Sequence, residues 1–142
     1  MSVPGILLDT SAWIAFFAPA GHHVLKSEVR AALNEERVFT CAVVRAELLV
    51  GARDGKAYRK LGELLLGLPQ IPIDDDAWAR AAALGFAMRR KGQSIPLSDL
   101  LIAEACRSRA LELWHLDEHY ETMRAHVKLA TRSYLTPRGR RE

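Results

Sequence analysis

Short apolar segments alternate with longer amphipathic segments along the chain, and this alternation constrains its fold more than any other feature. The short segments predict strands at residues 5–8, 37–40, 70–73, 111–116 and 127–131. A short helix is predicted after the capping hydroxyls of Thr10 and Ser11, and further helices at residues 22–36, 41–52, 56–66, 74–90, 99–109 and 118–124. Strands that alternate with helices form parallel sheets covered by helices. We therefore predict an α/β fold, a three-layer sandwich with a mostly parallel central sheet flanked by helices.

The length of 142 residues fits one domain. No linker-like stretch divides the predicted elements, so we predict that the domain spans residues 1–135. Pro72 predicts an edge position for the strand at 70–73, because proline lacks the amide that a central strand donates. Residues 136–142 are basic and contain proline and glycine, which predicts a frayed tail that is either disordered or in contact with RNA.

Charge and cysteine content limit the cellular context. The formal net charge of +3 is compatible with a nucleic-acid partner, although an even charge balance is common in soluble domains. Cys41 and Cys106 lie in apolar segments, which favours buried free thiols over a disulfide framework. Residues 1–11 lack the basic region of a secretory signal, and no stretch has the ~18–20 apolar residues that cross a membrane. We expect a cytoplasmic protein without a membrane segment.

Two acidic residues directly follow predicted strands. Asp9 comes after the first strand and Asp117 after the fourth. In open α/β sheets, sites form in the crevice beyond the carboxyl ends of the strands, so both carboxylates are candidates for a shared site. Each also has an ordinary explanation, as a residue in a turn or, for Asp117, as the cap of the next helix.

Two further acids belong to helices that are otherwise apolar. Asp99 opens the most apolar predicted helix, which points its side chain near the core, although it could also stabilise the helix dipole after a Ser98 cap. Glu47 has valines about one turn away on both sides, which predicts a carboxylate on an apolar face. Such a group needs a metal ion, a raised pKa or a basic partner such as Arg45 or Arg53.

A cluster of these four acids would persist only if it were protonated or neutralised by a cation. Two like charges ~4 Å apart repel by roughly 4 kcal/mol at an effective dielectric constant near 20. Oxygen ligands in this number suit Mg²⁺ or Mn²⁺ rather than zinc, and such ions catalyse phosphoryl chemistry. Together, Asp9, Glu47, Asp99 and Asp117 favour a metal site over four separate structural roles.

Four segments carry a family resemblance: LLDTSAWI at 7–14, VRAELLVGAR at 44–53, IPLSDLLIAEA at 95–105 and LWHLDEHYE at 113–121. In this order and spacing they resemble the successive motifs of PIN domains, and more closely the VapC-like toxin ribonucleases of bacterial toxin–antitoxin modules. The likeness covers about residues 5–132. Each motif alone is weak, but the ordered set is specific.

The resemblance implies a metal-dependent endoribonuclease that cleaves structured RNA with metal-activated water. Its partners would be an RNA substrate, a second copy of the chain and a small cognate antitoxin that blocks the site and represses its own operon. The cofactor would be Mg²⁺, or Mn²⁺, and either Ser11 or Thr10 would add a hydroxyl to the site. The catalytic and metal-binding acids would be Asp9, Glu47 and Asp99, with Asp117 as a fourth.

The chain departs from the family pattern at one position. The last motif often has threonine or serine two residues before its acid, and here that residue is His115. The departure leaves open whether a hydroxyl helps to bind metal there. His115 and His119 also have the spacing of a helical zinc pair, but because His115 falls in a predicted strand we expect a structural or surface role.

Further residues have functional and structural interpretations. Most basic side chains are explained as solvated helix faces, but some could form a phosphate-binding rim: Arg45, Arg53, Lys56, Arg59, Lys60, Arg89, Arg90 and Lys91. The large aromatics are predicted in the core, with a dimer surface as the alternative for the two phenylalanines: Trp13, Phe16, Phe17, Trp78 and Trp114.

Rival functions fit the sequence less well. A haloacid-dehalogenase-like phosphatase needs a second acid two residues after the first, where this chain has Ser11. A receiver-type phosphoacceptor module needs an acidic pair near the first strand and a late lysine, and neither is apparent in this sequence. A PIN-like domain kept only for RNA or partner binding is the remaining alternative, and the complete set of four acids argues against it.

Overall fold

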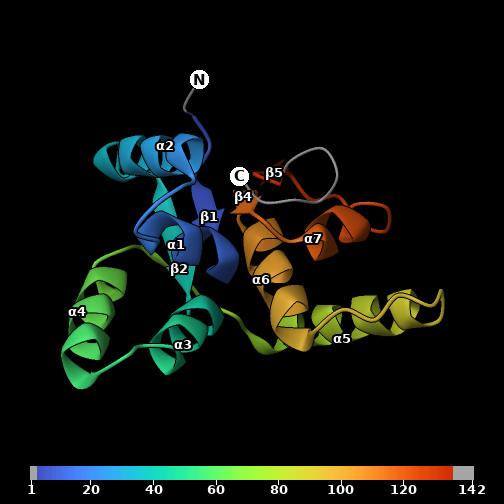
Figure 1. Cartoon of the computed structure of the whole chain (residues 1–142). Coiled ribbons are helices and arrows are strands. Elements are labelled where there is room, and N and C mark those ends of the chain that lie inside the picture. The colour runs from blue at the N-terminus through green and yellow to red at the C-terminus, as the bar shows by residue number, and fades with distance from the viewer. Residues whose placement is uncertain (1–2, 136–142) are drawn as a thin grey trace.

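Five strands form one sheet in the order β3-β2-β1-β4-β5, and every pairing between neighbours is parallel (Figure 1). The computed structural model describes residues 3–135. The strands are β1 (Ile6–Leu8), β2 (Val38–Cys41), β3 (Gln70–Ile71), β4 (Glu112–His115) and β5 (Thr131–Ser133). Because β1 lies between β2 and β4 and is fully buried, it is the centre of the sheet.

Seven helices among the described residues flank this sheet. They are α1 (Thr10–Phe17), α2 (His23–Asn34), α3 (Ala42–Val50), α4 (Gly55–Leu66), α5 (Asp75–Arg89), α6 (Leu97–Ser108) and α7 (Glu118–Met123). In Figure 1, α1 to α4 lie on the side of β1 and β2, α6 and α7 lie toward β4 and β5, and α5 packs along α6. This arrangement confirms the α/β prediction and its parallel sheet.

Aspartates fix the start of several helices. The side chains of Asp9, Asp54 and Asp74 accept the backbone N–H groups of residues three positions further on, which begins α1, α4 and α5. The most apolar helix is α6, in which residues 100–106 are all buried. It packs against α5, α3 and β4, and so brings its first turn to the end of the sheet where α1 and α7 also begin.

Several sequence-based boundaries and burial predictions are wrong. The fifth strand lies at Thr131–Ser133 instead of 127–131, because residues 127–130 connect α7 to the sheet. Trp78 is 47% exposed, since α5 buries the face formed by Ala77, Ala81, Leu84 and Met88. Phe17 is 46% exposed, whereas Trp13 and Trp114 are buried as predicted.

Other predictions agree with the structure. Strand β3 is at the edge of the sheet, and Pro72 follows it. Cys41 and Cys106 are buried free thiols. No helix in the described part of the chain is long and apolar enough to cross a membrane. The predicted tail at 136–142 lies outside the described residues, and the domain limits of 1–135 stay a prediction.

Candidate functional site

Asp9 is a buried carboxylate at the carboxyl end of the central strand. Its side chain is an N-cap, with Oδ1 accepting the N–H of Ala12 at 2.8 Å, and the hydroxyl of Ser11 lies 2.7 Å from each of its oxygens. Its backbone N–H donates to the carbonyl of Trp114, which joins the ends of β1 and β4. Burial raises the pKa of Asp9 from 3.8 to about 7, with Asp117 and Asp99 adding repulsion, although the bonds from Ser11 and Ala12 oppose the shift.

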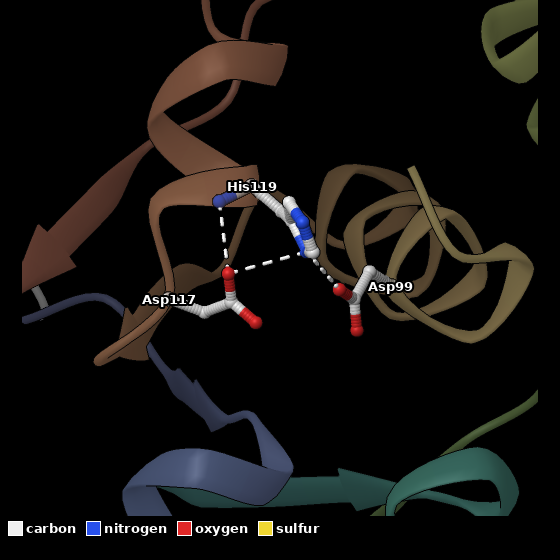
Figure 2. Close-up of side chains that lie close together, drawn as sticks. All are labelled: Asp99, Asp117 and His119. Atoms are coloured by element: carbon white, nitrogen blue, oxygen red, sulfur yellow. Dashed lines mark hydrogen bonds and ion pairs between the residues drawn. The ribbon is translucent and has the colours of Figure 1, made fainter. Parts of the chain in front are cut away.

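Asp99 and Asp117 meet on either side of an imidazole ring. Nδ1 of His119 lies 2.8 Å from Oδ2 of Asp99 and 3.2 Å from Oδ1 of Asp117 (Figure 2). The backbone N–H of His119 donates to the same Asp117 oxygen at 2.9 Å. One ligand atom from each of the three residues lies within 4.8 Å of the other two, a spacing that one metal ion can bridge.

The position of Asp99 differs slightly from the prediction. Helix α6 begins at Leu97 after Pro96, so Asp99 belongs to its first turn and Ser98 is not its cap. Burial raises the pKa of Asp99, and the nearby carboxylates of Asp117 and Glu47 add to the shift against the hydrogen bond from His119.

Glu47 lies near these acids, but the reason given for it from the sequence is wrong. Its side chain is exposed, because this face of α3 points to solvent and Val50 is 88% exposed. Its described hydrogen bond comes from the hydroxyl of Thr10 at 2.6 Å. Neither arginine considered as a partner contacts it, since Arg45 donates to Gln70 and Arg53 pairs with Asp54.

The buried phenol of Tyr120 lies beside the site and contacts Asp99. Its hydroxyl lies 3.4 Å from Oδ1 of Asp99. Burial raises the pKa of Tyr120 well above 10, and four carboxylates add to the shift: Asp9, Asp99, Asp117 and Glu47. Among the described residues, the group spaced to hold one ion consists of Asp99, Asp117 and His119; Asp9 and Glu47 act electrostatically on the same region but are not part of that group.

These residues fit a divalent cation. Within residues 3–135, no lysine or arginine forms an ion pair with any of the four acids, and the basic group between Asp99 and Asp117 is His119. Carboxylates held together without a cationic side chain repel one another unless a proton or a metal ion balances them. The donor set is mainly carboxylate oxygen, which suits Mg²⁺ or Mn²⁺.

A protein-family comparison identifies the family of this chain. The model described as "PIN domain" matches residues 6–125, which is most of the chain and includes all four acids. The chain belongs to the PIN-domain family. The family match and the parallel sheet of this PIN domain agree with the resemblance seen in its sequence.

Individual relatives of this PIN domain are similar over nearly their whole length. It is 34% identical over 133 residues to a protein named VapC ribonuclease Mb1587 of Mycobacterium bovis, covering 91% of this chain and 98% of the relative. It is 31% identical over 140 residues to Ribonuclease VapC18 of Mycobacterium tuberculosis, covering 93% and 96%.

Solved structures have the same fold. The VapBC-5 toxin–antitoxin structure from Mycobacterium tuberculosis matches with a TM-score of 0.64 and 26% identity, covering 92% of this chain and 99% of the other. VapBC2 from Rickettsia felis bound to a promoter DNA fragment matches with a TM-score of 0.72, covering 91% and 98%; its 16% identity supports the fold alone.

Sequence reasoning missed the place of His119 in the PIN-domain site. It was considered as a zinc partner of His115, yet the two rings have different neighbours: His119 contacts Asp99, and His115 contacts Glu121. The overlooked signal is the spacing Asp117-x-His119 at a helix start, where the capping acid receives the amide of the histidine.

Proposed function

We propose that this chain is a metal-dependent endoribonuclease and the toxin of a toxin–antitoxin pair. The observation that carries the proposal is the group of Asp99, Asp117 and His119, spaced to hold one ion, with Asp9 and Glu47 acting electrostatically on the same carboxylates. The relatives named ribonucleases and the structural neighbours named VapBC complexes support the assignment. The proposed metal ligands are Asp9, Glu47, Asp99 and Asp117.

Each residue has a defined task in this proposal. Asp99 and Asp117, which both contact His119, would hold a Mg²⁺ or Mn²⁺ ion, and the buried Asp9 and the exposed Glu47 would be its further ligands. A divalent cation, when bound, would supply positive charge that activates a water for attack on a phosphodiester and stabilises the negative charge on the leaving oxygen. Because the pKa of Asp9 is about 7 without metal, binding at neutral pH would release a proton from its carboxyl group.

The substrate must approach an acidic site, so cationic side chains are needed nearby. The rim residues predicted from the sequence lie on α3 and α4, between these two helices, and at and just after the end of α5, and most of them are exposed. Arg90 lies 5.7 Å above the ring of Phe86, which leaves its charge at the surface. We propose that these residues contact RNA phosphates.

Two protein partners complete the proposal: a cognate antitoxin and a second copy of the chain. Exposed apolar side chains offer surfaces for both, namely Ile14, Phe17, Val24, Tyr58, Leu64, Trp78, Phe86 and Leu97. The proposed compartment is the cytoplasm, where the thiols of Cys41 and Cys106 would stay reduced. Light scattering of the purified chain, alone and coexpressed with the protein encoded beside it, measures both assemblies.

The central test is cleavage of total cellular RNA with Mg²⁺, with Mn²⁺ and with chelator, beside the Asp9→Asn variant. We expect discrete fragments that require metal and disappear in the variant; their ends identify the target. Metal binding without cleavage would point to an absent substrate. If neither cleavage nor metal binding occurred, the alternative would hold, that of a phosphoacceptor or RNA-binding module without nuclease activity.

A further inference from the structure

His115 is a fully buried polar residue that the proposed chemistry does not use. It is the last residue of β4, two positions before Asp117. Its Nδ1 accepts the backbone N–H of Asp117 at 3.1 Å, and its Nε2 lies 2.7 Å from Oε2 of Glu121 on α7. The ring thus connects the backbone of one proposed metal ligand to a side chain of α7, the helix that this ligand caps.

These contacts determine the tautomer of the ring. Because Nδ1 accepts a hydrogen bond, it carries no proton, so the hydrogen of the neutral ring is on Nε2 and is donated to Glu121. The hydroxyl of Thr131 on β5 donates to the same Glu121 oxygen at 2.7 Å, and Arg124 donates to the other at 3.0 Å. The carboxylate of Glu121 is therefore held on three sides and fixes the orientation of the imidazole.

Asp117 depends on this support because it lies two residues beyond the end of β4 and is only partly buried. Its carboxylate is held from one side by the N–H of His119 at 2.9 Å. Its backbone is held from the other side by His115. With both contacts in place, the second carboxylate oxygen of Asp117 has a defined direction with respect to Asp99, as Figure 2 shows.

We infer that His115 is a positioning residue for Asp117, and that Glu121 and Thr131 hold its ring in the orientation that this requires. The inference rests on the proposed function in one respect, the role of Asp117 as a metal ligand. It gives β5, at the edge of the sheet, a part in the geometry of the site, through Thr131. Partners of this kind, one contact removed from the metal, typically affect metal affinity by about 10–100-fold.

The test compares His115→Leu with His115→Asn. Leucine fills the buried space but accepts no hydrogen bond, whereas an asparagine side chain accepts the N–H of the residue two positions later. Titration calorimetry with Mn²⁺ measures metal affinity, and amide hydrogen exchange followed by NMR measures the Asp117 N–H without any metal. We expect His115→Leu to lose about 10–100-fold in Mn²⁺ affinity and to exchange the Asp117 amide faster, while His115→Asn retains most of both.

The outcomes separate this inference from the proposed function. Equal losses in His115→Leu and His115→Asn, or no loss in either, would overturn the positioning role. Wild-type protein that bound no Mn²⁺ would refute the metal site instead, and amide exchange would then decide the positioning role alone. Should His115→Leu fail to fold, Glu121→Leu against Glu121→Gln repeats the comparison, because glutamine keeps an oxygen for the ring N–H and the Thr131 hydroxyl.

Discussion

The hydroxyl of Ser11 lies 2.7 Å from both carboxylate oxygens of Asp9. Oγ of Ser11 also accepts the backbone N–H of Leu116 at 3.0 Å. Ser11 therefore links the acid after β1 to the segment that follows β4. It also lowers the pKa of Asp9 against the effect of burial. One short side chain therefore supports the geometry and the ionisation of the same carboxylate.

Removing this hydroxyl should affect both stability and the charge of Asp9. Ser11→Ala leaves the Leu116 amide without its partner, and an unsatisfied buried donor costs about 1–3 kcal/mol. We expect a loss of that size in the free energy of unfolding, measured by urea denaturation. The acidic limb of the cleavage pH profile should move to higher pH, because Asp9 loses a hydrogen bond to its charged form. Ser11→Thr keeps the hydroxyl and is the matched control; equal effects in both variants would contradict this role.

Asp9 should make the metal-free protein less stable as pH rises. Its pKa is raised from 3.8 to about 7, so between these values the folded state holds a proton that the unfolded chain has lost. The free energy of unfolding then falls with rising pH across this window, by at most about 4 kcal/mol from this group. Below pH 4 both states are protonated and the contribution vanishes.

The comparison with Asp9→Asn isolates this contribution from that of other titrating groups. The variant cannot ionise at this position, so the difference in unfolding free energy between variant and wild type should grow from pH 4 to pH 7 in chelator. Saturating Mg²⁺ should reverse the trend for the wild type, because a bound cation favours the ionised carboxylate. A difference independent of pH would mean that Asp9 ionises normally in the folded protein.

The fold could be predicted from the sequence because its signals are local. Apolar runs such as residues 5–8 and 111–116 locate the central strands. The start of the first helix was predicted at the hydroxyls of Thr10 and Ser11, but its cap is Asp9. The predictions fail where tertiary packing decides which face of a helix is buried or which residues pair as a strand. Trp78 has the helical spacing of a core residue, but α5 turns the neighbouring stripe of small residues inward. Strand β5 is defined by pairing with β4, not by an apolar run of its own.

The four acids could also be picked out, but not their surroundings. Position after a strand suffices to suggest Asp9 and Asp117, because parallel strands share a carboxyl edge. Glu47 was chosen for burial that it does not have, and its proximity depends on how α3 lies beside α1 and α6. The contact of His119 with Asp99 joins residues 20 positions apart, and no local pattern specifies it.

Asp99→Asn should abolish RNA cleavage while preserving the fold. The variant removes a negative charge from the cluster around Tyr120 and keeps a polar group of the same shape, so metal-free protein should be as stable as wild type or slightly more stable. Thermal unfolding in chelator, beside a cleavage assay with Mg²⁺, measures both properties. Retention of full activity by this variant would remove Asp99 from the site.

Glu47→Gln should weaken metal binding without changing the stability of the metal-free protein. Glu47 is exposed and accepts the Thr10 hydroxyl at 2.6 Å, a bond that glutamine can keep through its own oxygen. The lost charge is therefore the main difference between the two side chains. Calorimetric titration with Mn²⁺ should show a lower affinity for Glu47→Gln, and Thr10→Val should show a smaller decrease because it frees the carboxylate without removing it. Unchanged affinity in Glu47→Gln would mean that the ion is held by Asp9, Asp99 and Asp117 alone. The role of Glu47 would then be structural, through its hydrogen bond with Thr10 at the start of α1.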